Sequence, residues 1–273
     1  MSASSRESPR PGTGARTGAS AVFGTAEVAV EFRDVVRTYP GGPRILDGLN
    51  LAIVRGETLV LIGPSGCGKT TALKLINRLA EADSGGVTVD GRDVMAWDPY
   101  DLRRHVGYVI QETGLFPHFD IARNVEVVPR LLGWDEKRRS ARADEMLKLV
   151  GLDPAQVRRR MPHELSGGQR QRVGVARSLA ADPPIVLMDE PFGALDPITR
   201  VKLQDDFSAL ARALRKTIVF VTHDITEAFR LATRIALMKN GRVHQLGRAA
   251  DFKDRPADDF VRDFVASGSH AVS

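Results

Sequence analysis

The sequence of 273 residues has little cysteine, few aromatic residues and no long apolar run. Its single cysteine, Cys67, excludes a disulfide within the chain and indicates a reducing compartment. Aromatic residues make up only 6% of the chain, which favours the aliphatic core of a parallel sheet covered by helices. The longest apolar runs, at residues 58–62, 185–188 and 217–221, have the length of strands, whereas a membrane-spanning helix needs about 18 apolar residues.

The N-terminal stretch is not a secretory signal, and the basic net charge does not by itself indicate a nucleic-acid-binding protein. Residues 1–27 are rich in Ser, Arg, Gly and Pro and lack the apolar centre of a secretory signal, so we expect a disordered tail. The formal net charge is +5, and compact basic clusters occur at residues 137–139 and 158–160. We interpret these clusters as solvated helix faces or contacts with nucleotide and lipid headgroups. We therefore expect no nucleic-acid partner.

Strand and helix patterns alternate along most of the chain. Alternating apolar positions predict strands, and apolar positions on one helical face predict helices. The expected strands are residues 28–36, 45–54, 57–62, 87–89, 185–188 and 217–221. The expected helices are residues 69–80, 169–180, 200–214 and 224–232, followed by a hairpin at 234–243 that turns at Asn240 and Gly241. This order is typical of an α/β fold with a parallel sheet and right-handed crossovers.

Residues 99–165 show a different pattern. Helices are expected at residues 125–132 and 136–150, and Gly151 is placed to stop the second of them. We interpret this interval as a helical insertion between two halves of the α/β core.

Residues 63–70, with the sequence GPSGCGKT, match the phosphate-binding loop pattern G-x-x-x-x-G-K-[ST] at every fixed position. The glycines let backbone N–H groups turn inward around phosphate oxygens, and the following helix adds its positive end. Lys69 is expected to reach the β- and γ-phosphates, and Thr70 to offer its hydroxyl to Mg²⁺. The residues expected to bind nucleotide here are Gly63, Pro64, Ser65, Gly66, Cys67, Gly68, Lys69, Thr70 and Thr71.

The apolar strand at residues 185–188 ends in two carboxylates, Asp189 and Glu190. Ligands of such sheets bind at the carboxyl ends of the strands, so Asp189 is expected beside the phosphate loop. There it would hold Mg²⁺ through the metal's water shell. Glu190 would orient and polarise the water that attacks the γ-phosphate.

Two more polar residues follow apolar strands and are expected at the same edge of the sheet. A lone histidine is more often structural than catalytic, but His223 follows the strand at 217–221 beside the other sites. We expect it to contact the γ-phosphate and to couple it to Glu190. Gln111 ends another short apolar strand and is expected to contact Mg²⁺ and the attacking water.

Residues 165–172, with the sequence LSGGQRQR, lie shortly before the carboxylate strand. Ser166 is a natural N-cap, and the two glycines after it expose the N–H groups at the start of a helix. The residues of this second expected phosphate site are Ser166, Gly167, Gly168 and Gln169. A head-to-tail homodimer would bring this site of one copy to the nucleotide of the other.

From residue 28 to residue 248 the chain resembles the ABC transporter ATPases. The phosphate loop, Gln111, residues 165–169, Asp189, Glu190, residues 194–196 and His223 stand in the family's order and spacing. The resemblance implies a P-loop NTPase fold of the ABC type, with a RecA-like parallel-sheet core, an N-terminal antiparallel β-subdomain and an inserted α-helical subdomain. It also implies that Tyr39 stacks on adenine, that Asp196 belongs to the nucleotide site, and that two ATPs are clamped between two copies.

A closer resemblance is to ABC importers of quaternary amines and other osmoprotectants, such as glycine betaine, choline and carnitine. It is carried by residues 74–78, 107–118, 192–200 and 259–264. It implies a peripheral ATPase at the cytoplasmic face of the inner membrane, with integral membrane permease subunits and an extracytoplasmic substrate-binding protein as partners. Many such proteins carry a C-terminal pair of CBS modules, whereas residues 249–273 are expected to be a short tail without them.

Other hypotheses stay open at this point. A non-transport ABC ATPase acting on DNA or the ribosome usually joins two ATPase domains or inserts coiled coils or zinc sites, and this chain shows one domain and one cysteine. Import of another small solute, such as an amino acid, is a further alternative. A catalytically silent regulator is disfavoured because Lys69, Asp189, Glu190 and His223 are all present.

Overall fold

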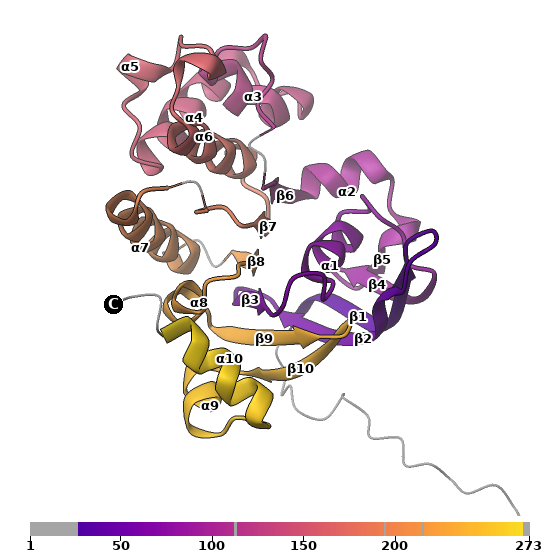
Figure 1. Cartoon of the computed structure of the whole chain (residues 1–273). Helices are drawn as coiled ribbons and strands as arrows, with labels where there is room; N and C mark the ends of the chain where they lie inside the picture. Colours follow the sequence, from indigo (N-terminus) through magenta and orange to yellow (C-terminus); the bar gives the residue numbers. More distant parts are fainter. Residues whose placement is uncertain (1–26, 112–113, 194, 214–215, 270–273) are drawn as a thin grey trace, which may run out of the picture.

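A computed structural model describes residues 27–111, 114–193, 195–213 and 216–269 of the chain (Figure 1). The expected N-terminal tail, except its last residue, and Ala194 of the 194–196 segment lie outside the described residues. Within the described residues, no helix combines the length and the apolar character needed to cross a bilayer.

An antiparallel sheet opens the chain. Its strands, in the order β2-β1-β4-β5, are β2 (Arg44–Val54), β1 (Val28–Thr38), β4 (Ser84–Val89) and β5 (Arg92–Asp93). Apolar residues such as Val30 and Phe32 alternate along β1 and are buried on one face. This sheet is the antiparallel β-subdomain that was expected from the sequence.

The core sheet has six strands in the order β10-β9-β3-β8-β7-β6. They are β10 (Arg242–Gly247), β9 (Arg234–Lys239), β3 (Thr58–Ile62), β8 (Thr217–Val221), β7 (Ile185–Asp189) and β6 (Val106–Val109). All pairs are parallel except the β9–β10 hairpin. The parallel-sheet core is therefore as expected.

Both faces of the core sheet are covered. On β3, Leu59 and Leu61 pack into an apolar cluster shared with the antiparallel sheet and with α1 (Lys69–Ile76). Val60 and Ile62 pack into a second cluster on the other face. Burial on both faces explains why the parallel strands appear in the sequence as continuous apolar runs.

Besides α1, the helices around the core are α2 (Pro99–His105), α7 (Pro197–Ala213) and α8 (Ile225–Leu231). Short 3₁₀ turns occur at Val94–Ala96 and Pro162–Glu164. A separate helical layer, at the top of Figure 1, contains α3 (Ile121–Leu131), α4 (Glu136–Leu149), α5 (Pro154–Val157) and α6 (Gly167–Ala180). Helix α6 packs against α3 and α4.

The helical layer differs from the expected interval of residues 99–165. The short strand expected before Gln111 is β6, and it pairs in parallel with β7 at the edge of the core sheet. The interval therefore begins too early, because it includes a core strand. Helix α6, which was expected within the α/β core, packs against α3 and α4 as well as against the core strand β6, and it extends the helical layer past residue 165.

The residues after β10, which were expected to form a short tail, are largely helical. They form α9 (Ala249–Asp254) and α10 (Asp259–Ser269). Phe252 and Val261 are buried in the core cluster, and the Lys239 ammonium lies 3.7 Å from the centre of the Phe260 ring. These contacts attach the two helices to the edge of the core sheet formed by β9 and β10.

Candidate functional site

The phosphate-binding loop connects β3 to α1, and two of its glycines are required by the backbone. Gly63 has φ 141°, and a Cβ at this position would lie 2.2 Å from the carbonyl oxygen of Met238. Gly68 has φ 101°, and its Cβ would lie 2.5 Å from the Leu46 side chain. Only glycine fits both places, so close packing of the backbone by itself requires glycine at these two positions of the motif.

Lys69 lies across this loop. Its Nζ donates hydrogen bonds to the carbonyl oxygens of Gly63 (2.8 Å) and Pro64 (2.9 Å) and lies 3.7 Å from Cys67 Sγ. The ammonium group is thereby held at the loop whose N–H groups can bind an anion. A pocket of about 490 Å³ adjoins the outer side of the loop and is lined by Arg44, Pro64, Ser65 and Lys239, among others.

Asp189 and Thr70 meet as expected. The Thr70 hydroxyl donates to Asp189 Oδ1 over 3.1 Å, and Asp189 is almost fully buried at the end of β7. Burial raises the pKa of Asp189, and the hydrogen bond from Thr70 partly offsets this effect. A buried carboxylate beside a hydroxyl offers oxygen donors of the kind that suit Mg²⁺, which takes its remaining ligands from phosphate oxygens and water.

The Glu190 carboxylate lies between two other expected residues. Gln111 Nε2 donates to Glu190 Oε2 (3.2 Å), and His223 Nδ1 lies 3.2 Å from Glu190 Oε1. The ends of β6, β7 and β8 thus bring Gln111, Glu190 and His223 together, in agreement with the prediction that they share one edge of the sheet.

The backbone of Glu190 is unusual, and the sequence did not indicate it. Its φ is 47°, a left-handed conformation that is uncommon for a residue with a Cβ. Glu190 N donates to Val221 O (3.0 Å), and Gln171 Nε2 donates to Glu190 O (3.0 Å). Gln171 is therefore a site residue that the sequence reasoning missed. Its one available signal was its position two residues after Gln169, inside the same motif.

Ser166 caps α6. Gln169 N donates to Ser166 Oγ (3.2 Å), and Ser166 N donates to Gln169 Oε1 (2.9 Å), which forms a reciprocal capping box. In the part of the chain that the structure describes, no hydrogen bond joins Ser166 or Gln169 to the phosphate-binding loop. The structure therefore does not bring the two expected phosphate sites together within one chain.

Tyr39 and Asp196 occupy the margins of the site. The hydroxyls of Tyr39 and Thr71 lie 3.4 Å apart, and the Arg37 guanidinium lies 5.4 Å from the centre of the Tyr39 ring. Asp196 accepts a hydrogen bond from Thr199 N (3.0 Å) at the start of α7. Bonds from Thr199 lower the pKa of Asp196.

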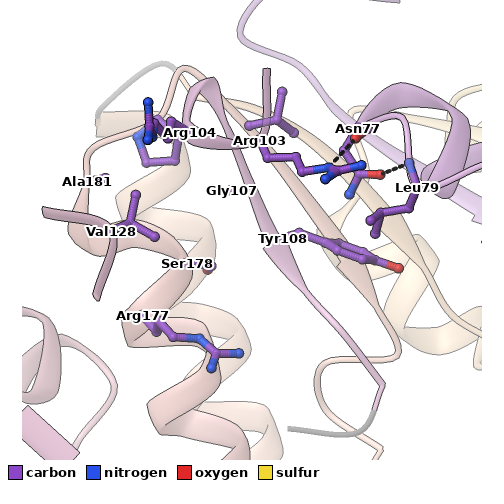
Figure 2. A pocket seen from close by; sticks show the side chains of 12 residues that line it. Asn77, Leu79, Arg103, Arg104, Gly107, Tyr108, Val128, Arg177, Ser178 and Ala181 are labelled. Atoms are coloured by element: carbon purple, nitrogen blue, oxygen red, sulfur yellow. Dashed lines mark hydrogen bonds between the residues drawn. The ribbon is translucent and has the colours of Figure 1, made fainter. Parts of the chain in front are cut away.

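A separate groove of about 200 Å³ lies between the edge strand β6 and helices α3 and α6 (Figure 2). Its lining includes Leu79, Arg103, Tyr108, Val128, Arg177 and Ser178. Half of the Leu79 surface is exposed, and Arg103 donates from Nε to Asn77 O (3.3 Å). Burial raises the pKa of Tyr108 to about 12. The lining of this groove combines apolar side chains with the basic side chains of Arg103, Arg104 and Arg177.

Comparison with known proteins gives consistent matches. The ABC transporter family profile matches residues 46–193. The choline transport ATP-binding protein OpuBA of Bacillus subtilis is 55% identical over 232 residues, which cover 85% of this chain and 61% of that protein. The glycine betaine uptake system ATP-binding protein YehX of Escherichia coli is 50% identical over 243 residues, covering 89% and 78%.

The fold also matches a solved structure. The dimeric structure of a post-hydrolysis state of the ATP-binding cassette MJ0796, bound to ADP and Pi, has a TM-score of 0.74 at 35% identity and covers 80% of this chain and 98% of that one. The chain thus has the fold of an ATP-binding cassette. It spans about 60% of the length of the first relatives that it matches, 61% of one and 62% of another.

Proposed function

Because the chain belongs to the ABC transporter family, as one of its ATP-binding proteins, we propose that it hydrolyses ATP with Mg²⁺ to power the import of a small solute. One observation carries the proposal. The Glu190 carboxylate lies between the Gln111 amide and the His223 imidazole, next to the residue, Asp189, that Thr70 ties to the phosphate-binding loop.

Each residue at this edge of the sheet has a chemical role in the proposal. The loop N–H groups and Lys69 bind the β- and γ-phosphates, and Thr70 and Asp189 hold Mg²⁺. The metal, when bound, neutralises charge on the phosphates. Glu190 orients a water for attack on the γ-phosphorus and accepts its proton, while the bond to the β-phosphate oxygen breaks and ADP leaves with the electron pair.

Gln111 and His223 prepare Glu190 for this step. His223 also contacts the γ-phosphate in the proposal, so it joins the state of the nucleotide to the position of the carboxylate. Gln111 approaches the other carboxylate oxygen and contacts Mg²⁺ and the attacking water. The positive φ of Glu190 supports a functional role, since strained backbone is often found at active sites.

The proposed active form is a head-to-tail homodimer. Ser166, Gly167, Gly168 and Gln169 at the start of α6 make no hydrogen bond to the phosphate-binding loop of their own chain among the described residues. Their helix end is therefore available to the γ-phosphate held by a second copy. Asp196 lies at the start of α7 and is proposed to contact the nucleotide across the same interface. The solved relative MJ0796 is described as dimeric.

Tyr39 is proposed to stack on adenine. Its ring is partly exposed and is held by the Thr71 hydroxyl and by Arg37, which is itself bound to Asp83 (2.9 Å). A ring that is fixed before binding loses less conformational freedom when the base stacks on it.

The proposed partners are integral membrane permease subunits and an extracytoplasmic substrate-binding protein. The groove of Figure 2 supports a permease contact, because it presents apolar side chains together with Arg103 and Arg104 at the edge of the core. The chain would then lie at the cytoplasmic face of the membrane. The names of the relatives support a quaternary amine osmoprotectant, such as glycine betaine, choline or carnitine, as the solute.

The variant Glu190→Gln tests the mechanism. It keeps the shape of the side chain but cannot accept the proton, so hydrolysis is expected to fall by about 100-fold or more, which is typical for the loss of a general base. With Mg²⁺ and ATP the variant should elute as a dimer in size-exclusion chromatography, and without ATP as a monomer. Glu145→Gln, an exposed carboxylate on α4, is the matched control and should behave as wild type. A Glu190→Gln protein that stays monomeric in saturating ATP would contradict the proposed homodimer that holds ATP between two copies.

A further inference from the structure

His223 is an exposed side chain at a site that demands accurate placement. Its imidazole is 72% exposed, and among the described residues it contacts the Glu190 carboxylate through Nδ1. The packing around the ring is therefore too sparse to fix its position. The backbone of residues 222–224 must do so instead.

The buried hydroxyl of Thr222, the residue before His223, binds the backbone of Asp224, the residue after it. Thr222 is 2% exposed, and its Oγ1 donates to Glu227 Oε2 (2.6 Å) while accepting a hydrogen bond from Asp224 N (3.0 Å). The residue before His223 is thus tied to the residue after it. Both are tied to the first turns of α8. We call Thr222, Asp224 and Glu227 the Thr222 clamp.

Glu227 extends this clamp to α7. It is 7% exposed, and besides Thr222 it accepts a hydrogen bond from Gln204 Nε2 (3.0 Å). Arg200 Nε lies 4.0 Å from Glu227 Oε1, and Arg200 Nη2 donates to Leu195 O (3.1 Å). The carboxylate therefore joins the turn that carries His223 to the segment that precedes α7.

Burial of the Glu227 carboxylate carries a desolvation cost that opposes its contribution to stability. Burial raises the pKa of Glu227, which means that the low-polarity surroundings disfavour its ionised form. Networks of buried polar groups can often be replaced by apolar residues at no cost in stability. The arrangement is therefore better explained by the geometry it imposes than by the energy it contributes.

We propose that Thr222 and Glu227 are positioning residues for His223. They hold its backbone so that the exposed imidazole meets the Glu190 carboxylate, and they connect that geometry to α7 through Gln204 and Arg200. The inference rests on the proposed ATP hydrolysis and adds to it two residues that contact neither nucleotide nor metal.

The test is a pair of substitutions at Thr222. Thr222→Val removes the hydroxyl and keeps the shape, and kcat for ATP is expected to fall at least about tenfold with KM changed less than about threefold, since a small misplacement near the chemistry can cost a factor of 100. Thr222→Ser restores the hydroxyl and should recover most of the lost kcat. Equal losses in the two variants, or a Thr222→Val enzyme with wild-type kcat, would overturn the proposal.

A matched control separates positioning from stability. Thr217 is also buried on β8, and its hydroxyl accepts a hydrogen bond from Gly56 N (2.9 Å) at the far end of the strand. Thr217→Val should lower the melting temperature about as much as Thr222→Val but leave kcat within about twofold of wild type, because it lies away from the site. A similar fall in kcat for both variants would mean that the Thr222 effect is structural.

A double variant tests whether the effect passes through His223. In a His223→Ala background, Thr222→Val should change the residual rate by less than about twofold, because residues that act through one another are not additive. A full tenfold loss of kcat in that background would refute the proposal that Thr222 acts through His223. Wild-type protein that fails to hydrolyse ATP would instead count against the proposed function, so the two failures are distinguishable.

Discussion

Gly63 offers a direct test of why the phosphate-binding loop has its observed shape. An alanine Cβ at this position would lie 2.2 Å from Met238 O, whereas carbon and oxygen in close contact are normally about 3.3 Å apart. The loop and the end of β9 would have to separate by about 1 Å to relieve the clash. Overpacking of this kind costs about 1–3 kcal/mol. The φ of 141° adds about 1–3 kcal/mol of backbone strain for any residue with a Cβ.

Gly63→Ala is therefore expected to lose about 2–6 kcal/mol of folding free energy, the sum of the two effects. It should also bind ATP at least about tenfold more weakly, because a displacement of about 1 Å moves every N–H group that faces the phosphates, and a hydrogen bond to a charged group contributes about 1.5–3 kcal/mol. Denaturant unfolding measures the first quantity, and titration with a fluorescent ATP analogue measures the second.

Gly91→Ala is the control for backbone strain alone. Gly91 has φ 73° in the β4–β5 turn, and its Cβ would meet nothing within 4 Å. It should lose only about 1–2 kcal/mol of stability and keep wild-type affinity for ATP. If Gly63→Ala also kept that affinity, the reasoning that packing against β9 shapes the phosphate site would be refuted.

Two further predictions concern the surroundings of the site. The pKa of Glu227 is raised by burial, so the folded chain loses stability relative to the unfolded chain as pH rises from the ordinary value of 4.5 through the folded-state pKa. The melting temperature of Glu227→Gln should therefore rise relative to that of wild type as pH increases over that range, and the difference should be constant at higher pH. A difference in melting temperature that does not change with pH would contradict the raised pKa. Arg37→Met should raise KM for ATP about two- to fivefold with kcat unchanged, because an exposed cation–π contact contributes about 0.5–1 kcal/mol to holding Tyr39. Steady-state kinetics measure this, and an unchanged KM would mean that Arg37 does not support the ring.

The order of strands and helices was predictable because most of these elements have strong local patterns. The central strands β3, β7 and β8 are buried on both faces and therefore appear as apolar runs. Strand β6 was harder to assign to the core, because Val106–Val109 has only four residues and no periodicity to separate it from the helices around it. The C-terminal helices were missed for a related reason. Helix α9 has six residues, and packing of Phe252 stabilises it more than its intrinsic propensity.

The site was predictable where its geometry is local or follows from strand ends. The phosphate-binding loop is a continuous segment, and Gln111, Glu190 and His223 each follow a parallel strand, so the topology alone brings them to one edge. The bond from Gln171 to Glu190 O depends on the packing of α6 against the core. The Thr222 clamp likewise depends on which side chains are buried between α7 and α8. No spacing in the sequence encodes such contacts.

At Glu190, a position that the strand pattern predicts is combined with a backbone conformation that only tertiary contacts explain. A left-handed conformation costs a non-glycine residue about 1–2 kcal/mol, and it persists only when the surroundings impose it. Here the imposing contacts come from two directions, since Glu190 N donates to Val221 O on β8 and Gln171 on α6 donates to Glu190 O. Strand β8 leads into His223, and Ser166 is the N-cap of α6. The direction of the carboxylate is therefore set jointly by the core sheet and by the helical layer, and a movement of α6 relative to the core has to be accommodated at Glu190 itself.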